Sequence, residues 1–334
     1  MELIKAEGKD RQHQLILGEA IRRGFYTEEV THELGFPATL LVSPSGRTHL
    51  LVQGIPASWT SMQARYLCDL KSLTKSVFEA VRIPSPPSIR FSDLNRSRDA
   101  ITQFLKSHAP CVCKPVIGDN GVGVEMNIST LAEVEEYLAR NSELDDKFLL
   151  EKYVKGEDLR IQVIGGRIVA ACVREPAYVI GDGNSSLQEL VEERRGIIKG
   201  QNPNNQLDLD AISMILIEEQ GLTLAAIPKQ GQKVVLKTVS NIGQGGIPVD
   251  VTDRLHPEYS KWVRKVAEFL NTTYFALDII GNAPEVSPSH GSYAIEINSE
   301  PAWLHHTFSE VRTHNLAKVV VDELCNEEVT ISAK

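Results

Sequence analysis

Apolar and polar residues alternate along many short stretches of the chain, and this period of two predicts β-strands. The final two stretches are almost continuously apolar, which is typical of buried strands. The predicted strands lie at residues 39–42, 49–52, 111–114, 123–127, 148–154, 159–164, 167–174, 233–239, 274–280 and 293–298.

Between the strands, apolar residues recur three or four positions apart, and this spacing predicts amphipathic helices. Ser92 and Asp93 are suitable capping residues for one of them. The predicted helices cover residues 10–23, 62–80, 92–108, 129–140, 257–271 and 313–325, with a further helix from about 186 to 194. Helices and strands mixed in this order indicate an α+β fold.

The chain of 334 residues is long enough for several lobes. A cluster of prolines at 84–87 marks the clearest boundary. We expect an N-terminal α/β segment with a linking helix at 1–87, a small lobe with a glycine-rich loop at 88–155, and a large lobe at 156–334.

Composition excludes several classes of protein. The net charge of −9 argues against a nucleic-acid partner and against an anionic membrane surface. No apolar stretch approaches the length of a membrane span, and five scattered cysteines indicate reduced thiols in a cytoplasmic protein. Cys111 and Cys113 alternate on one strand, so we expect them to pack on one face.

Lys114 ends an apolar strand and is followed by three glycines, Gly118, Gly121 and Gly123. Glycines allow backbone N–H groups to approach an anion closely, and the lysine adds a positive charge. A nucleotide triphosphate would suit such a site, although the lysine precedes the glycines and the pattern is not a Walker motif. The alternative is a hairpin with a glycine turn and an exposed lysine.

Acidic residues interrupt the two final apolar strands. Glu296 and Asn298 are two positions apart, so their side chains share one face, and an antiparallel neighbour could place Asp278 beside them. Carboxylate and amide oxygens favour Mg²⁺. The alternative is a polar edge that faces solvent.

Several motifs occur together in a fixed order over about residues 65–330. They are Asp69–Lys75, Lys114–Pro115 with the three glycines, Glu151–Arg160, Arg174–Gly183, Asn241 with Gly245 and Gly246, Asp250–Asp253 with His256–Glu258, and Asp278 with Glu296–Asn298. In these motifs the chain resembles the ATP-grasp superfamily, and most closely the ATP-grasp module of cyanophycin synthetase and of bifunctional glutathione synthetases.

The resemblance implies the ATP-grasp fold, in which two α+β lobes hold ATP between them, and it implies roles for individual residues. Lys71 and Lys114 would contact the ATP phosphates, and the loop from Gly118 to Gly123 would close over them. Adenine would be bound by the stretch Glu151, Lys152, Tyr153 and Val154, with Glu151 and Val154 acting through their backbone, and the ribose by Glu157 or Asp158. Arg160 and Arg174 would stabilise the transferred phosphoryl group, and Asn241, Gly245 and Gly246 would contact the acyl substrate. Asp278, Glu296 and Asn298 would bind one or two Mg²⁺ ions, with Mn²⁺ as the alternative.

The implied activity is that of an ATP-dependent carboxylate–amine ligase, which forms an amide through an acyl phosphate and releases ADP and phosphate. Its partners would be small carboxylate and amine substrates, and a homodimer is compatible with the sequence. The alternatives are a glutathione-synthetase-like ligase acting on a γ-glutamyl dipeptide, a small-molecule kinase on the same fold, and a nucleotide-binding protein without turnover.

Some residues have simpler interpretations or depart from the motifs. Lys71 lies on a predicted helix, where a lysine is commonly just solvated. His305 and His306 are adjacent, and neighbours on a strand face opposite ways, so we interpret them as loop or surface residues and not as metal ligands. Relatives carry a small pair after the Glu-x-Asn motif, whereas this chain has Pro301-Ala302-Trp303, and the polar stretch 201–206 also departs.

Overall fold

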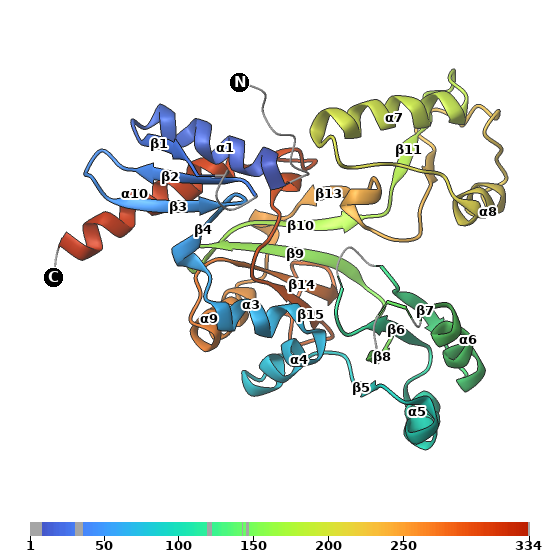
Figure 1. The fold of residues 1–334 in the computed structure, drawn as a ribbon. Helices are drawn as coiled ribbons and strands as arrows, with labels where there is room; N and C mark the ends of the chain where they lie inside the picture. The colour runs from blue at the N-terminus through green and yellow to red at the C-terminus, as the bar shows by residue number, and fades with distance from the viewer. Residues whose placement is uncertain (1–8, 31–35, 119–121, 142, 145–146, 333–334) are drawn as a thin grey trace. The chain divides into compact units, whose positions relative to one another are not determined.

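The computed structural model describes residues 9–30, 36–118, 122–141, 143–144 and 147–332. The chain forms two compact units that do not follow chain order (Figure 1). Unit 1 comprises residues 1–60, 168–253 and 300–334, and unit 2 comprises residues 61–167 and 254–299. This division differs from the three consecutive segments expected from the sequence, because two late strands return to pair with a strand near the middle of the chain.

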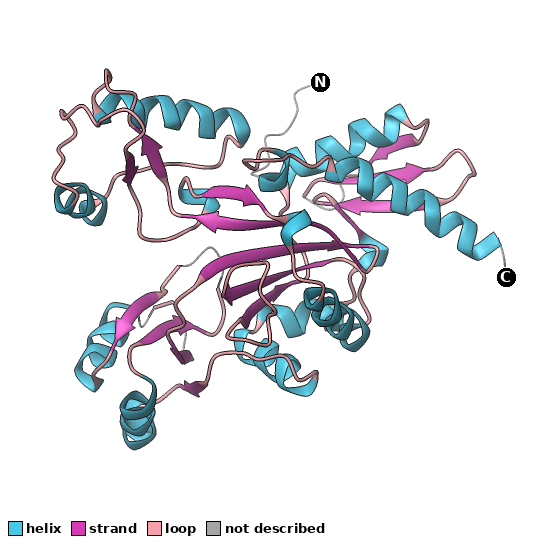
Figure 2. Cartoon of the chain, turned by 180° about the vertical axis from the view of Figure 1, so that it is seen from behind, coloured by secondary structure: helices cyan, strands magenta, loops and turns pink. Residues whose placement is uncertain are grey.

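A four-stranded antiparallel sheet with the order β1-β2-β3-β4 forms the first part of unit 1. Helices α1 and α10 pack against each other beside this sheet (Figure 2). The bounds are α1 Lys9–Arg22, β1 Tyr26–Glu29, β2 Ala38–Val42, β3 Thr48–Val52, β4 Ile55–Pro56 and α10 Leu316–Ser332. The strands expected at 39–42 and 49–52 are therefore confirmed as a pair, whereas β1 was not predicted.

The second part of unit 1 contains two antiparallel strand pairs and two helices. Strand β10 (Arg167–Glu175) pairs with β13 (Ile247–Asp250), and β11 (Tyr178–Ile180) pairs with β12 (Lys233–Val235). Helices α7 (Leu187–Gln201) and α8 (Ala211–Glu219) contribute apolar side chains to one core with β11 and β12.

Two expectations for this region were wrong. Helix α7 continues to Gln201 because the buried Ile198 extends its apolar face, so it is longer than the helix expected to end at about residue 194. Helix α8 was missed because its sequence is almost continuously apolar and shows no helical periodicity. Its start is nevertheless well defined, since the Asp210 carboxylate accepts a hydrogen bond from the Ser213 backbone N–H at 2.8 Å.

Unit 2 contains the small α+β lobe expected around the glycine-rich turn. Its antiparallel sheet has the order β5-β8-β6-β7, and α5 and α6 pack against each other and against its core. Cys111 and Cys113 are fully buried among these apolar side chains, as their alternation predicted. Asp93 caps α5, also as predicted. The bounds are β5 Ser88–Phe91, α5 Leu94–His108, β6 Cys111–Pro115, β7 Glu125–Ile128, α6 Leu131–Asn141 and β8 Phe148–Lys152.

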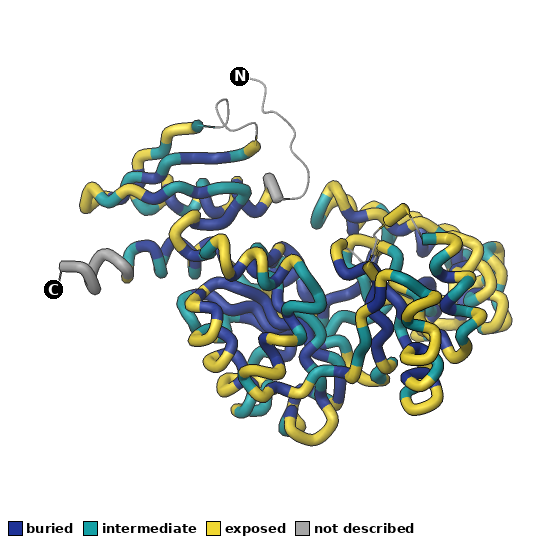
Figure 3. Tube along the Cα trace, turned by 60° about the horizontal axis from the view of Figure 1, so that its bottom comes forward, coloured by how far each residue is buried: buried dark blue, intermediate teal, exposed yellow. Residues whose placement is uncertain are grey.

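The rest of unit 2 is built around three antiparallel strands in the order β9-β14-β15. Helices α3 and α4 pack against β15. The bounds are α3 Met62–Asp69, α4 Lys71–Ala80, β9 Glu157–Ile164, α9 Glu258–Leu270, β14 Phe275–Gly281 and β15 Tyr293–Asn298. Buried positions concentrate in the strands, while turns and outer helix faces are exposed (Figure 3).

The single helix expected over residues 62–80 is broken at Leu70, so that prediction was wrong. Leu70 has an extended backbone, with φ −102° and ψ 104°. The Thr74 hydroxyl donates to the Leu67 carbonyl at 3.1 Å, which satisfies an acceptor at the end of α3. The break makes Lys71 the first residue of α4 instead of a residue in a helix interior.

Two further properties concern the cysteines and the helices. All five cysteines are free thiols. Within the described residues, no helix combines the length and the apolar character that crossing a bilayer requires.

Candidate active site

The acidic residues of the two final strands lie together in unit 2. Strands β14 and β15 run antiparallel, so that Asp278 lies opposite Glu296 and Ala276 lies opposite Asn298. The Asn298 side-chain amide donates to Asp278 Oδ2 at 3.3 Å. Asp278 is only 7% exposed, which excludes the alternative of a polar edge facing solvent at this position.

Arg160 approaches Asp278 from the other neighbouring strand. The two residues lie opposite each other in β9 and β14, and Arg160 Nη1 donates to both carboxylate oxygens of Asp278, at 3.1 and 3.0 Å. Both side chains are buried, and Arg160 Nε is buried with no acceptor among the described residues. A buried guanidinium with an unsatisfied N–H is costly without a further partner, so an anionic group beside it would be stabilised.

Glu296 experiences opposing electrostatic influences. Burial raises the pKa of its carboxyl group above the usual value, and the neighbouring charge of Asp278 raises it further. Lys71, Lys114 and Arg160 act in the opposite direction, which shows that all three cations lie within electrostatic reach of Glu296. Two adjacent carboxylates and an amide oxygen are the donor set that a hard divalent cation prefers, so these residues fit Mg²⁺.

Lys114 is held by a buried carboxylate. Its Nζ donates to Glu151 Oε1 at 3.1 Å, and Lys75 forms an ion pair with the second oxygen of the same carboxylate. Lys114 and Glu151 are 6% and 4% exposed, so the alternative of an exposed lysine is wrong. Burial alone would raise the pKa of Glu151, but the two lysines together hold it below the usual value.

This cluster of Lys75, Lys114 and Glu151 carries one net positive charge. The side chain of Lys75 is 11% exposed, and its Nζ donates to the Pro86 carbonyl at 3.0 Å. Burial lowers the pKa of Lys75, and Glu151 opposes that effect. Neither the position of Lys75 nor the side-chain role of Glu151 was predicted, because the three residues come from α4, β6 and β8 and meet only in the folded chain.

The start of α4 is tied to the segment that follows β6. The Lys71 backbone N–H donates to the Val116 carbonyl at 3.2 Å, and its Nζ donates to the Gly118 carbonyl. Lys71 is therefore more than a solvated helix residue, because it contacts the first glycine of the predicted phosphate loop. Of the other two glycines, Gly121 lies outside the described residues.

Gly123 ends the glycine-rich segment in a conformation that requires glycine. Its φ is +69°, and a Cβ there would come within 2.9 Å of Pro115 Cγ. The hydroxyl of Tyr137 donates to the Gly123 carbonyl at 2.7 Å, which anchors this end of the segment to α6.

The residues predicted to bind adenine and ribose continue from β8 into β9. The backbone N–H groups of Lys152 and Tyr153 donate to the carbonyls of Pro87 and Pro110, at 2.9 and 3.0 Å. Val154 follows directly after Tyr153. Glu157 and Asp158 then open β9 and lie opposite Gly281 and Ile280 of β14. Their nucleotide contacts remain predictions.

The other predicted substrate residues belong to unit 1. Arg174 lies opposite Pro248 in the pair of β10 and β13. Asn241 caps the short helix η2 (Ile242–Gln244) by accepting a hydrogen bond from the Gly243 N–H at 2.8 Å. Gly245 follows with φ +90°, and a Cβ on Gly246 would lie 2.7 Å from the Ser240 carbonyl oxygen. Both glycines thus allow a tight backbone turn.

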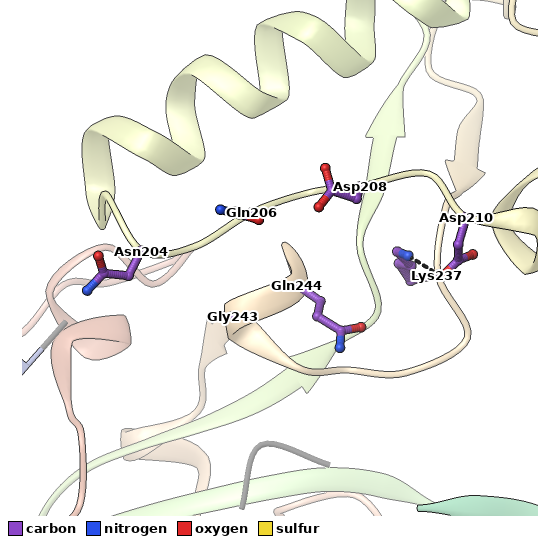
Figure 4. A pocket seen from close by; sticks show the side chains of 7 residues that line it. All are labelled: Asn204, Gln206, Asp208, Asp210, Lys237, Gly243 and Gln244. Carbon is purple, nitrogen blue, oxygen red and sulfur yellow. Dashed lines mark hydrogen bonds and ion pairs between the residues drawn. The ribbon is translucent and has the colours of Figure 1, made fainter. Parts of the chain in front are cut away.

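A polar pocket adjoins this turn within unit 1 (Figure 4). It has a volume of about 310 Å³. Lys237, which is 7% exposed, donates to Asp210 Oδ2 at 2.7 Å at one side of it. That hydrogen bond and the Ser213 N–H hold the pKa of Asp210 at about 2. The lining residues include Asn204, Gln206, Asp208, Asp210, Lys237 and Gln244. No periodic pattern of residues predicted this pocket.

The architecture is the ATP-grasp fold. A solved bifunctional glutathione synthetase from Pasteurella multocida matches it with a TM-score of 0.71 and 24% identity, over 95% of this chain and 44% of that protein. The ATP-grasp fold and the resemblance to this superfamily, both predicted from the sequence motifs, are confirmed.

Comparison with curated sequences finds related enzymes but no matching family profile. No profile of a known protein family matches the chain. The chain is 30% identical over 274 residues to a cyanophycin synthetase of Trichormus variabilis, covering 78% of this chain and 29% of that protein. It is 27% identical over 316 residues to a bifunctional glutathione biosynthesis protein of Clostridium perfringens, covering 92% of this chain and 40% of that protein. The chain thus spans less than half the length of these relatives.

Proposed function

We propose that the chain is an ATP-dependent carboxylate–amine ligase that joins small amino-acid-like substrates and releases ADP and phosphate. The observation that carries the proposal is the pairing of the buried Asp278 with the half-buried Glu296, with Lys71, Lys114 and Arg160 within electrostatic reach of Glu296. The ATP-grasp fold and the similarity to enzymes named as cyanophycin synthetase and glutathione biosynthesis protein support it.

The lysines would bind and orient the ATP phosphates. Phosphoryl transfer depends mainly on positioning and on neutralising charge. Lys114 is preorganised by Glu151, so it would lose little side-chain entropy when it contacts a phosphate. Because the cluster of Lys75, Lys114 and Glu151 retains one positive charge, it can attract an anion without a large rearrangement.

The carboxylates would hold one or two divalent ions. Asp278, Glu296 and Asn298 fit Mg²⁺, with Mn²⁺ as the alternative. A bound ion would neutralise negative charge on the phosphates. Arg160, fixed by Asp278, would present its buried N–H groups to the transferred phosphoryl group or the acyl phosphate.

The chemistry has two steps. A carboxylate oxygen of the first substrate attacks the γ-phosphorus of ATP, ADP leaves, and an acyl phosphate forms. The amine of the second substrate then attacks the acyl carbon, phosphate leaves, and the amine proton passes to solvent. The segment from Gly118 to Gly123 would exclude water and so protect the acyl phosphate from hydrolysis. Asn241, Gly245 and Gly246 would border the acyl substrate, and Arg174 would stabilise its developing charge, as the resemblance implies.

A second candidate is a small-molecule kinase. The buried cations and carboxylates of unit 2 suit any transfer of a γ-phosphoryl group, whereas a ligase also needs an amine acceptor. The two functions differ in their products: a kinase retains the phosphoryl group on its substrate, and a ligase releases it as inorganic phosphate.

The test is a substrate panel assayed with ATP and Mg²⁺. Amino acids and short peptides, including a γ-glutamyl dipeptide, would be tested singly and in pairs for release of ADP and phosphate. Release that requires both a carboxylate and an amine supports the ligase. Equimolar ADP and phosphorylated substrate, without free phosphate, would contradict it and support the kinase.

Location and assembly complete the proposal. Five free cysteines are consistent with the reducing cytoplasm, where we place the protein. The homodimer that the sequence allows would be tested by light scattering during gel filtration.

A further inference from the structure

Unit 1 contains a buried cluster of metal-binding side chains that has no role in the proposed reaction. Cys172 lies on β10, and His305 and His306 lie on the short helix η4 (Leu304–Thr307). Their exposures are 0%, 7% and 0%. One potential ligand atom from each residue lies within 4.8 Å of the other two. From these residues we infer a site for a transition-metal ion, with Zn²⁺ as the expected ion.

The two histidines were interpreted from the sequence as loop or surface residues, and the surface alternative is wrong. That interpretation assumed that adjacent side chains face opposite ways, as they do on a strand. In a 3₁₀-helix the residues follow one another at about three per turn, so neighbours diverge by only about a third of a turn. The two imidazole rings consequently lie 4.2 Å apart, centroid to centroid.

The backbone of η4 is fixed in a way that keeps the cluster in place. The His306 N–H donates to the Trp303 carbonyl at 3.0 Å, and the His306 carbonyl accepts from the His314 N–H at 2.8 Å. The Ser309 hydroxyl also donates to the His306 carbonyl, at 3.3 Å. Such preorganised ligands bind a metal ion with little loss of conformational freedom.

The neighbouring carboxylate is committed to other partners. Asp250 lies opposite Cys172 in the β10–β13 pair. Its Oδ1 is 2.6 Å from both His314 Nε2 and Thr252 Oγ1, and Arg312 Nε lies 3.4 Å from its Oδ2. The ligands on which the site depends are therefore a thiolate and two imidazoles, and the fourth position of a tetrahedral ion would be taken by water.

Donor chemistry separates this site from the carboxylate pair in unit 2. Thiolate and imidazole ligands favour Zn²⁺ and related transition metals, whereas carboxylate and amide oxygens favour Mg²⁺. Around Zn²⁺ the Zn–S and Zn–N distances are about 2.3 and 2.0 Å, so the ligand atoms, now within 4.8 Å of one another, need to approach by at most about 1.5 Å. Binding releases the Cys172 thiol proton to solvent.

The site would connect η4 to the strand that carries Arg174. Cys172 and Arg174 are two residues apart on β10, so their side chains share one face of the strand. A bound ion would also fix the segment containing Trp303, where the chain departs from the motif of its relatives. The ion would thus stabilise a part of unit 1 without taking part in the reaction, and this role does not depend on the proposed ligase activity.

The direct experiment is metal analysis of the untagged full-length chain, loaded with excess Zn²⁺ and then dialysed into metal-free buffer. We expect about one tightly bound Zn²⁺ per chain. Absence of retained Zn²⁺ in the folded wild-type protein would overturn the inference, whatever the variants show. This measurement is independent of turnover, so it fails or succeeds separately from the ligase proposal.

Variants and a spectroscopic probe identify the ligands. Cys172→Ser and His306→Gln should lose the ion, whereas Cys113→Ser, which removes an equally buried thiol in unit 2, should retain it. In the Co²⁺-loaded wild-type protein, a thiolate-to-cobalt charge-transfer band should appear, and Cys172→Ser should abolish it. Retention of Zn²⁺ and of this band by Cys172→Ser would contradict the assignment.

Discussion

Lys114 Nζ lies 3.1 Å from Glu151 Oε1 in the interior of unit 2, and Lys75 pairs with the second oxygen of the same carboxylate. One carboxylate thus serves two lysines on different elements. The arrangement keeps a buried positive charge beside the predicted phosphate loop without leaving either ammonium group unpaired.

Glu151→Gln should destabilise the protein strongly, because two buried ammonium groups would lose their counter-ion. Breaking a buried ion pair in this way costs about 3–5 kcal/mol. Chemical denaturation at neutral pH measures the loss. A stability equal to that of the wild type would show that the two lysines do not depend on Glu151.

The same variant should change the response to acid. The pKa of Glu151 is lower in the folded protein than its ordinary value of 4.5, so its stabilising contribution is complete above pH 4.5. That contribution is lost as the pH falls through the lowered folded-state value. Glu151→Gln should therefore lose less stability than the wild type on acidification below pH 4.5.

Lys114→Met should abolish ATP turnover while the protein remains folded. Glu151 keeps Lys75 as its partner, so the substitution leaves no uncompensated buried charge. The loss of phosphate contact should lower activity by at least about a hundredfold, which corresponds to about 2.7 kcal/mol. The matched control is Lys106→Met, at an exposed position on α5, which should retain wild-type activity. Wild-type turnover by Lys114→Met would contradict the phosphate role.

Glu296→Gln should weaken Mg²⁺ binding, because it removes one of the two carboxylates. Isothermal titration of Mg²⁺ in the presence of a non-hydrolysable ATP analogue measures this change. In the wild type, affinity should fall as the pH falls through the raised pKa of Glu296, since protonation removes the ligand. An unchanged Mg²⁺ affinity in the variant would exclude Glu296 as a ligand.

In the absence of metal, Glu296→Gln should increase the stability of the folded protein at neutral pH. The folded-state pKa of Glu296 lies above its ordinary value of 4.5, so the wild type loses stability as the pH rises from 4.5 through that raised value. The uncharged glutamine does not carry this cost. The metal-free variant should thus melt at a higher temperature than the metal-free wild type at neutral pH.

The carboxylate face illustrates what the sequence could predict. Because side chains alternate along a strand, Glu296 and Asn298 must share one face. Two apolar strands that follow each other near the chain end are expected to pair. These local rules allow Asp278 to lie beside Glu296 but do not determine the register, and the structure shows that the two residues lie opposite each other. The fold was predictable for a different reason, because the ordered motifs resemble those of a known superfamily.

Other features depend on contacts between distant parts of the chain. The pairing of Lys75 with Glu151 requires α4, broken from α3 at Leu70, to meet β8. No local pattern encodes that meeting. Likewise, Cys172 and His306 are more than a hundred residues apart, and only the folded chain shows that they share a cluster.

Gly156→Ala should destabilise unit 2. A Cβ at this position would lie 2.2 Å from the Gly281 carbonyl oxygen, and neither backbone can move without disturbing the β9–β14 pair. We expect a loss of about 1–3 kcal/mol, typical of forced overpacking. The matched control is Gly196→Ala on α7, where the Cβ meets open space and helix propensity predicts a gain of about 0.5–1 kcal/mol. Thermal unfolding of both variants measures the contrast, and equal melting temperatures would contradict it.

The central claim is that the chain joins a carboxylate to an amine through an acyl phosphate. It is tested most directly by incubating the enzyme with ATP, Mg²⁺ and an amino-acid mixture whose carboxyl groups carry heavy oxygen. The expected products are an amide and inorganic phosphate that contains heavy oxygen from the substrate carboxylate. Inorganic phosphate without heavy oxygen, or ADP formed without an amide, would contradict it.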